Sequence, residues 1–185
     1  MSITVTTGPA TEVVTTTEVL RHLHWSTADA GLLTDLGWMI KAAREEAEQI
    51  TGRSIGSQTI SYKFDAFDGP IYLPRAPVTS VTSVKYLDFD GTEQTVSSGD
   101  YAFDNSDPPR IVHDDVWPIS NGETDSVRVV FVAGYSDSTC PAGIRQWILL
   151  KVGSLFVNRE SSAERPAVPL QFVDHLLDRY RICAA

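Results

Sequence analysis

Cysteine is nearly absent from this chain, which has only Cys140 and Cys183 among its 185 residues. The two are not spaced as a C-x-x-C pair and are too few for a disulfide framework, so we expect reduced, structural thiols. Long apolar runs are lacking as well. No stretch approaches the ~20 apolar residues of a membrane span, and the first residues lack the basic start and apolar run of a secretory signal. We therefore expect a chain that is made in the cytoplasm and has no membrane partner.

Positive charge is also in short supply. Lys and Arg number 15 against 24 Asp and Glu, which gives a formal net charge of -9. Tight, sequence-independent binding to nucleic acid depends on Lys and Arg that displace counterions from phosphates, so this balance argues against that function. Hydrophobic residues at 42% and charged residues at 21% are near globular averages, which excludes wholesale disorder and fibrous repeats.

Two kinds of periodicity divide the chain. Apolar residues recur at steps of three and four from Leu32 to Ile50, which predicts an amphipathic helix ending at Gly52. The helical period returns after Pro141 and again over residues 170–180. Between these parts the period is 2, and Gly and Pro interrupt the chain frequently, which predicts short strands. The predicted strands are residues 60–64, 71–73, 78–86, 92–96, 101–103, 110–112 and 127–132.

The order of these elements predicts an α+β fold. A helical core would consist of the long helix in the N-terminal half and two C-terminal helices, and an antiparallel β-sheet would be inserted between them, because no long crossover helix separates the strands. We expect a single structural unit with four parts. These are an extended N-terminal arm (1–16), a helical part (17–53), a β-rich insertion (54–137), and a C-terminal helical part with its tail (138–185).

One motif points to catalysis. Residues 84–92 resemble the hhhhDxDGT motif of haloacid-dehalogenase-type phosphatases, in which the first Asp, here Asp88, is the nucleophile and the second, here Asp90, is a general acid and base. The acidic pair after His113 even imitates that family's magnesium ligands. However, no Lys lies between Thr92 and Asp114 to neutralise a phosphoryl intermediate, and no helix there is long enough to connect parallel strands. We therefore interpret Asp88-x-Asp90 as hairpin-turn chemistry and keep the phosphatase as an alternative.

Other signs of catalysis are missing from the sequence. The four histidines have no metal-ligand spacing, and no P-loop, dinucleotide glycine fingerprint or H-E-x-x-H occurs. We expect no catalytic residue, metal or cofactor, and no enzyme activity. Besides the phosphatase, another alternative is a β-sheet module that binds a ligand through an exposed aromatic row. It would require four rings to face solvent: Tyr62, Phe64, Tyr72 and Tyr86.

Several stretches, taken in order, carry a resemblance to a known family. They are residues 18–23, 40–48 and 51–53; residues 73–78, 80–86 and 88–91; and residues 129–135, 140–146, 156–160 and 176–181. With these, the chain resembles the phage head-tail connector (adaptor, or head-completion) proteins of the gp6-like and phiE125 gp8-like type. The resemblance extends from Thr17 to Arg181.

The resemblance implies a structural virion protein. About twelve copies would form a ring below the portal vertex, extend the DNA channel and link head to tail; a gene transfer particle or a prophage would use the same part. The implied partners are the portal protein, a downstream head-completion or tail protein, and other copies of the chain. The expected location is the head-tail junction of the virion, and the host cytoplasm during assembly. DNA would pass without sequence-specific binding, because an acidic lumen repels phosphates.

Two sets of interface residues follow. In the family the C-terminal part engages the portal, which by resemblance assigns that role to Phe172, Leu176, Tyr180 and Arg181; packing of the apolar members on the preceding helix is the alternative. From the residues themselves, we expect the N-terminal arm to contact a neighbouring subunit, because an extended β-branched arm has little reason to fold back alone. The residues assigned to this contact are Ile3, Val5, Val13 and Val14.

Overall fold

The computed structural model describes residues 1–158 and 171–182, and it forms two compact units. The β unit consists of Met1–Ala10 and Ser57–Gly134, and the helical unit consists of Thr11–Gly56 and Tyr135–Ala185. The fold is α+β, as the sequence predicts. The β segment begins three residues later and ends three residues earlier than the predicted insertion, and the first ten residues join it.

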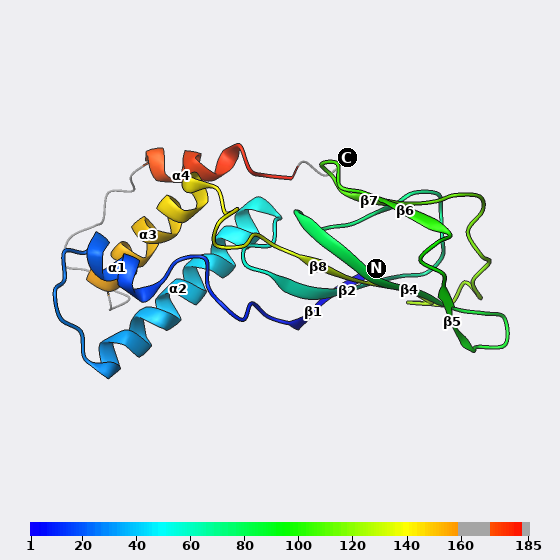
Figure 1. The fold of residues 1–185 in the computed structure, drawn as a ribbon, viewed down its shortest axis with the longest axis horizontal. Helices are drawn as coiled ribbons and strands as arrows, with labels where there is room; N and C mark the ends of the chain where they lie inside the picture. The colour runs from blue at the N-terminus through cyan, green and yellow to red at the C-terminus, as the bar shows by residue number, and fades with distance from the viewer. Residues whose placement is uncertain (159–170, 183–185) are drawn as a thin grey trace. The chain divides into compact units, whose positions relative to one another are not determined.

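The helical unit contains four helices (Figure 1): α1 (Thr16–His22), α2 (Ala30–Thr51), α3 (Ala142–Val157) and α4 (Gln171–Asp178). Helix α3 lies at the centre and contacts each of the other three. Helix α2 ends, as predicted, at Gly52, whose φ of 71° is the left-handed conformation that glycine adopts without steric cost. Within residues 1–158 and 171–182, no helix has the length and apolar character needed to cross a membrane.

Glu18 fixes the beginning of α1. Thr15 and Glu18 form a capping box, in which the Thr15 side chain accepts a hydrogen bond from the Glu18 backbone and the Glu18 carboxylate accepts one from the Thr15 backbone. Arg145 of α3 also donates to Glu18. Burial opposes ionisation of this carboxylate, but the hydrogen bonds from Thr15 and Arg145 outweigh it and lower the pKa of Glu18 below its ordinary value.

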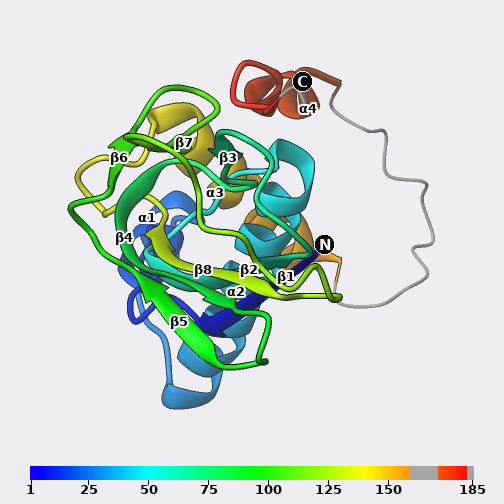
Figure 2. The ribbon, with the colours of Figure 1, turned by 90° about the vertical axis from the view of Figure 1, so that its right-hand side faces the viewer.

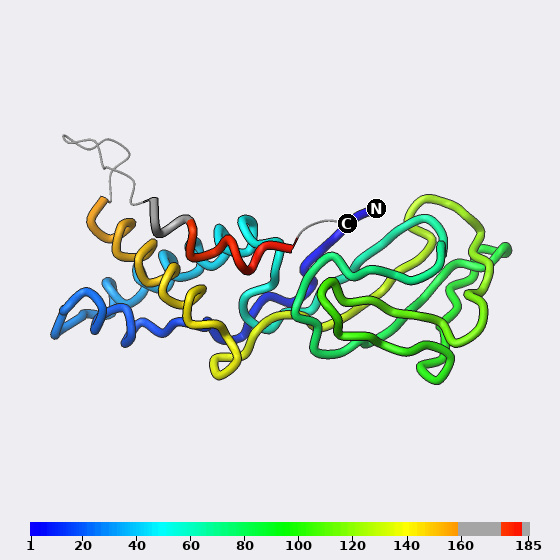
Figure 3. The backbone as a smooth tube through the Cα atoms, turned by 90° about the horizontal axis from the view of Figure 1, so that it is seen from above, coloured from blue at the N-terminus to red at the C-terminus, as the bar shows by residue number. Residues whose placement is uncertain are grey.

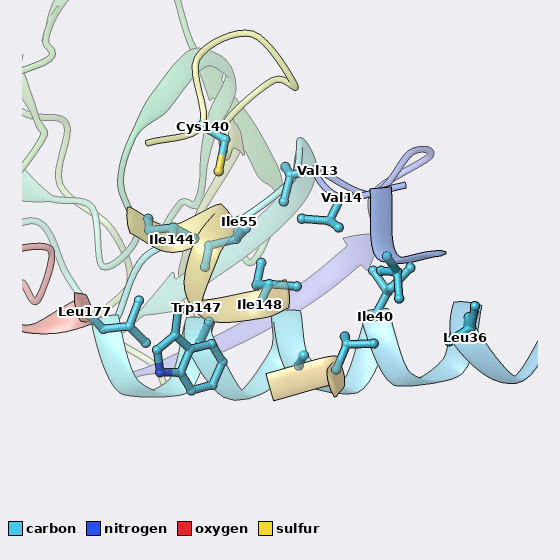
Figure 4. Packing of buried hydrophobic residues seen from close by; sticks show 14 residues of the cluster. Val13, Val14, Leu36, Ile40, Ile55, Cys140, Ile144, Trp147, Ile148 and Leu177 are labelled. Carbon is cyan, nitrogen blue, oxygen red and sulfur yellow. The ribbon is translucent and has the colours of Figure 1, made fainter. Parts of the chain in front are cut away.

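The core of the helical unit lies between α2 and α3 (Figure 4). Ala43 and Ala47 of α2 are fully buried, and their small side chains allow a close approach by α3. Trp147 and Ile148 of α3 fill the space beside them, with Leu177 of α4 at one end. Helix α4, red in Figure 3, packs on both α2 and α3.

A buried arginine ties the N-terminal segment to this core. The Arg44 side chain on α2 is only 4% exposed, and its Nε lies 2.9 Å from a carboxylate oxygen of Glu12. Its Nη1 lies 2.9 Å from Glu48, one turn along α2. Glu48 in turn accepts a hydrogen bond of 2.6 Å from the backbone N–H of Ile55, beyond the end of the helix. The network therefore joins three segments that are separate in the sequence.

The β unit contains two antiparallel sheets with eight strands: β1 (Ser2–Thr7), β2 (Gln58–Phe64), β3 (Ile71–Tyr72), β4 (Val78–Leu87), β5 (Glu93–Val96), β6 (Tyr101–Asp104), β7 (Arg110–His113) and β8 (Val127–Ala133). The larger sheet has the order β1-β2-β8-β4-β5, and Figure 2 shows β4, β8, β2 and β1 in succession from left to right. The smaller sheet has the order β3-β7-β6. The bounds of the seven predicted strands are thereby confirmed to within two residues. The strands form two sheets, however, and the N-terminal arm adds an eighth strand, β1, to the larger one.

The two sheets share one hydrophobic core. Along β8, Val127, Val129, Phe131 and Ala133 are buried and alternate with less buried residues, as the period of 2 requires. They pack with Ile111 of the smaller sheet in the same cluster. On β1, at the edge of the larger sheet, Ile3 and Val5 lie opposite Tyr62 and Ile60 but are 46% and 50% exposed, so the inner face is not covered there.

The N-terminal arm pairs with a strand of its own chain, although the sequence led us to expect that it would not fold back. Contact of Ile3 and Val5 with a neighbouring subunit stays a prediction. Strand β1 pairs with β2 in antiparallel register, with Ile3 opposite Tyr62 and Val5 opposite Ile60. The edge of β2 opposite β8 is free to pair, so the β-branched arm gains a hydrogen-bonding partner within its own protomer. Further along, Val13 and Val14 are 2% and 1% exposed within the helical core and are not available to a neighbouring subunit.

Candidate interaction surfaces

The predicted portal-binding residues divide into buried and exposed members. Leu176 and Tyr180 are partly buried and pack against the helical core, and their contact with the portal stays a prediction. Gly143 in the first turn of α3 leaves room for Tyr180, since a Cβ atom there would lie 3.1 Å from the tyrosine ring. Arg181 is exposed, and its Nη2 lies 3.3 Å from Oδ1 of Asp178. The side chain of Phe172 lies outside the described residues.

The Asp88 motif is a hairpin turn, as the sequence predicts. Asp88 Oδ1 accepts backbone N–H bonds from Asp90 at 3.0 Å and Thr92 at 2.9 Å, and Oδ2 accepts a bond of 2.9 Å from the Gln94 side chain. The bonds from Gln94 and from the turn backbone hold the pKa of Asp88 below its ordinary value. Both carboxylate oxygens are thus used to stabilise the connection between β4 and β5.

Side-chain ion pairs across three strands also stabilise this hairpin. Glu93 on β5 accepts a hydrogen bond of 2.7 Å from Lys85 on β4 and a further one from Arg128 on β8. The three side chains lie on the outer face of the larger sheet, where Lys85 stands directly opposite Arg128. Within residues 1–158 and 171–182, no group of three or more His, Cys, Asp or Glu side chains is placed to hold a metal ion.

The four rings proposed for a ligand-binding row do not form one. Phe64 is buried in the β core, and Tyr62 and Tyr86 are partly buried against it. Tyr72 is exposed, but it belongs to the smaller sheet. The β-sheet ligand module therefore lacks the exposed row that it requires.

A pocket of about 220 Å³ lies at the β1 edge of the β unit. Its wall contains the rings of Tyr62 and Phe64, whose centroids are 5.2 Å apart, together with Ile71 and Tyr72 of β3. The remaining lining residues are Met1, Ala66, Asp68 and Pro70. We call this hollow the β1-edge pocket. Ile3 and Val5 are 46% and 50% exposed on the neighbouring strand, so the apolar surface extends beyond the pocket.

Several large apolar side chains project into solvent away from this pocket. In the β unit, Phe89 is 75% exposed at the tip of the β4–β5 hairpin, and Val116 and Ile119 are 75% and 73% exposed in the loop around Trp117. Trp117 itself stacks on Phe67 at a centroid distance of 4.7 Å. Sequence reasoning missed these residues because an apolar residue in a turn carries no sign of its exposure.

The helical unit also exposes apolar residues. Trp38 on α2 is 65% exposed, and Lys41 Nζ lies 5.8 Å from the centroid of its ring. Trp25 is half exposed and meets Phe156 of α3 edge to face. Exposed tryptophans are typical of protein interfaces, where they contribute a large share of the binding energy.

Comparison with known proteins gives a full-length structural match. No family model matches the sequence, and no curated protein matches it. A chain in the neck of an empty gene transfer agent (GTA) particle, computed with C6 symmetry, is 25% identical with a TM-score of 0.82. A chain in the virion of the native GTA particle is 24% identical with a TM-score of 0.80, and one in the native neck, computed with C12 symmetry, is 24% identical with a TM-score of 0.78. Each match covers 100% of this chain and 97% of the other.

Proposed function

We propose that this protein is a structural subunit of the neck of a virus-like particle, a head-tail connector that forms a ring below the portal and extends the DNA channel towards the tail. One observation carries the proposal: the whole chain superposes on a chain of a GTA neck, with 97% of that chain covered and a TM-score of 0.82. The same match over both units makes it a likeness of the whole architecture and not of one common motif.

Self-association is supported by symmetry and by surface. The similar chains belong to necks computed with C6 and C12 symmetry, which supports a ring of about twelve copies. Exposed Phe89, Ile119 and Trp38 give this chain apolar surface that solvent alone does not favour. Location at the head-tail junction, after assembly in the host cytoplasm, follows from this role.

DNA passes through such a ring without being held. A net charge of -9 per copy, multiplied around a ring, repels phosphates if the surplus carboxylates face the lumen. The duplex then slides, and the protein needs no base contacts. An assembled ring with a basic lumen would contradict this part of the proposal.

The portal-facing surface is assigned to the end of α4. Arg181 is exposed beside Asp178, and Tyr180 presents the part of its ring that the core leaves uncovered. Phe172 and Leu176 belong to the same proposed surface, with Leu176 contributing only its exposed part. The tail-side protein would bind elsewhere on the ring.

Native mass spectrometry tests the ring. The chain is measured alone and together with the portal protein of the same genome; a complex with about twelve copies of this chain on the portal is expected. Failure to bind the portal at any concentration would overturn the connector role. Magnesium-dependent hydrolysis of phosphate esters that Asp88→Asn abolishes would replace it with the phosphatase alternative.

A pair of matched variants tests the portal surface. Arg181→Glu is expected to weaken co-sedimentation with the portal at least tenfold, since reversing a charge at an interface introduces repulsion. Arg21→Glu reverses an equally exposed arginine on α1 and serves as the control. Equal binding by the two variants would move the portal interface away from the end of α4.

A further inference from the structure

The β1-edge pocket lies between β2 of the larger sheet and β3 of the smaller sheet. The inner face of the larger sheet is covered by three strands only, and Tyr62, Phe64 and the exposed Ile3 and Val5 lie where that cover ends. In a core, such side chains would be buried. An apolar hollow next to exposed β-branched residues is typical of a binding site for another apolar group.

The same unit presents an apolar group of matching size. Phe89 is 75% exposed at the tip of the β4–β5 hairpin, and the turn beneath it is fixed by three hydrogen bonds to Asp88 and by the ion pairs of Glu93. The ring is therefore presented by a rigid element. A pocket of about 150 Å³ is enough to bind benzene, and the β1-edge pocket measures about 220 Å³, so a phenyl ring fits.

A single copy cannot bring the two together. In the order β1-β2-β8-β4-β5, the pocket lies beside β2 and the hairpin joins β4 to β5, two to three strand spacings or roughly 10–14 Å away across the sheet. Both lie at the same end of the sheet, because Ser2, Lys63, Arg128 and Lys85 form one row across it, β4 ends two residues after Lys85, and Phe89 follows in the turn. They are thus at the same level but on opposite sides.

We propose that Phe89 of one copy inserts into the β1-edge pocket of the next copy. Two different patches on opposite sides of one molecule make a head-to-tail contact, and such contacts generate a closed ring when the rotation between copies closes. This inference rests on the self-association part of the proposed function and names the residues that carry it.

The size of the contact explains why a ring is needed. Burying one exposed phenylalanine removes on the order of 150 Å² of apolar surface, far below the roughly 1,200 Å² of a stable pairwise interface. An isolated pair held by this contact alone dissociates readily. In a closed ring each copy makes the contact twice, and the portal holds neighbouring copies at high effective concentration.

Photocrosslinking tests the contact directly. Phe89 is replaced by the photoreactive p-benzoylphenylalanine, and rings are assembled on the portal from a mixture of isotope-labelled and unlabelled chains. The expected adduct joins position 89 of one chain to a peptide containing Tyr62 or Tyr72 of a differently labelled chain. An adduct of position 89 with the portal, or with any other peptide of the neighbouring copy, would overturn the proposal.

Matched variants give the second readout. Phe89→Ser is expected to weaken each contact roughly 10–100-fold and to lower the ring yield accordingly, whereas Val116→Ser, which removes an equally exposed apolar residue from another loop, leaves the yield unchanged. Ala66→Phe blocks the pocket from its exposed rim. In an equimolar mixture, the Ala66→Phe chain still has Phe89 and the Phe89→Ser chain still has an open pocket, so each pair retains one usable contact. Pairs of copies, but no rings, are expected.

The two levels of the proposal fail differently. If Phe89→Ser assembles into rings as well as the unchanged chain does, the ring exists but this contact does not hold it. If the unchanged chain forms no ring with the portal, the connector function itself fails.

Discussion

Replacing Arg44 tests how the N-terminal segment is held to the helical unit. Arg44→Met keeps an unbranched apolar stem of similar length but removes the charge that Glu12 and Glu48 face. Their side chains are 27% and 14% exposed, so neither carboxylate recovers full hydration when its partner is lost. Breaking a buried ion pair in this way costs about 3–5 kcal/mol. Since whole domains are stable by only about 5–15 kcal/mol, the loss is a large fraction of the total.

Thermal unfolding followed by circular dichroism at 222 nm measures this loss, because that signal reports the helices. At 4–8 °C per kcal/mol for a domain of the helical unit's size, the melting temperature falls by at least about 12 °C. Glu45→Gln is the control. Glu45 also contacts Arg44, at 3.4 Å, but its side chain is 56% exposed, and exposed pairs contribute at most about 1 kcal/mol.

A triple variant separates charge from packing. Arg44→Met combined with Glu12→Gln and Glu48→Gln removes the two carboxylate charges that Arg44 faces, and glutamine at 48 can still accept the N–H of Ile55. Most of the lost stability should return. The reasoning is refuted if Arg44→Met alone unfolds at the temperature of the unchanged protein, or if the triple variant is less stable than the single one.

Three further predictions concern individual positions. Gly37→Ala, in open space on α2, should stabilise the helical unit by about 1 kcal/mol, whereas Gly52→Ala, at a φ of 71°, should destabilise it by about 1–2 kcal/mol; thermal melts with opposite shifts check both. Glu18→Gln should destabilise the protein at pH 7. The difference in stability between variant and unchanged protein should vanish as the pH falls below about 4.5 and through the lowered pKa of Glu18, because a lowered pKa contributes stability only where the folded carboxylate is ionised. Equal destabilisation at pH 7 and pH 3 would contradict this. In a Cys183→Ser background, Cys140, whose pKa burial raises to about 11, should react with a thiol reagent at pH 8 only after unfolding.

The sequence predicts local structure well where one segment carries its own signal. Helix α2 follows from its apolar period and ends at Gly52 because only that residue accepts the left-handed conformation there. The Asp88 turn follows from its side chain's tendency to bond the backbone two residues on. Neither depends on distant parts of the chain.

Long-range pairing is where sequence reasoning fails. Strand β2 pairs with β8, and Gln58 lies opposite Ala133, far along the chain, so the division into two sheets is decided by contacts that no local pattern records. The β-branched arm signals extended structure, but not that the free edge of β2 would receive it. Burial of Arg44 likewise depends on Glu12, which the folded arm brings to it.

Surface exposure was the least predictable property. The assigned portal residues rest on resemblance, and of these Tyr180 and Leu176 prove to be partly core. The β1-edge pocket forms between β2 and β3, strands of different sheets that only the folded unit brings together. Phe89 projects because the turn beneath it is tight. None of these features has a residue pattern of its own.

The interleaved units have a consequence for synthesis on the ribosome. Helix α2 ends at Thr51, but its main packing partner α3 begins only at Ala142, after the whole middle of the β unit has been translated. At a translation rate of about 5–20 residues per second, α3 is made roughly 5–20 s after α2. Until then α3 cannot pack on the apolar face of α2, which contains Leu36 and Ile40. During that interval the part of the apolar face of α2 that α1 does not cover is accessible to chaperones and to other nascent chains.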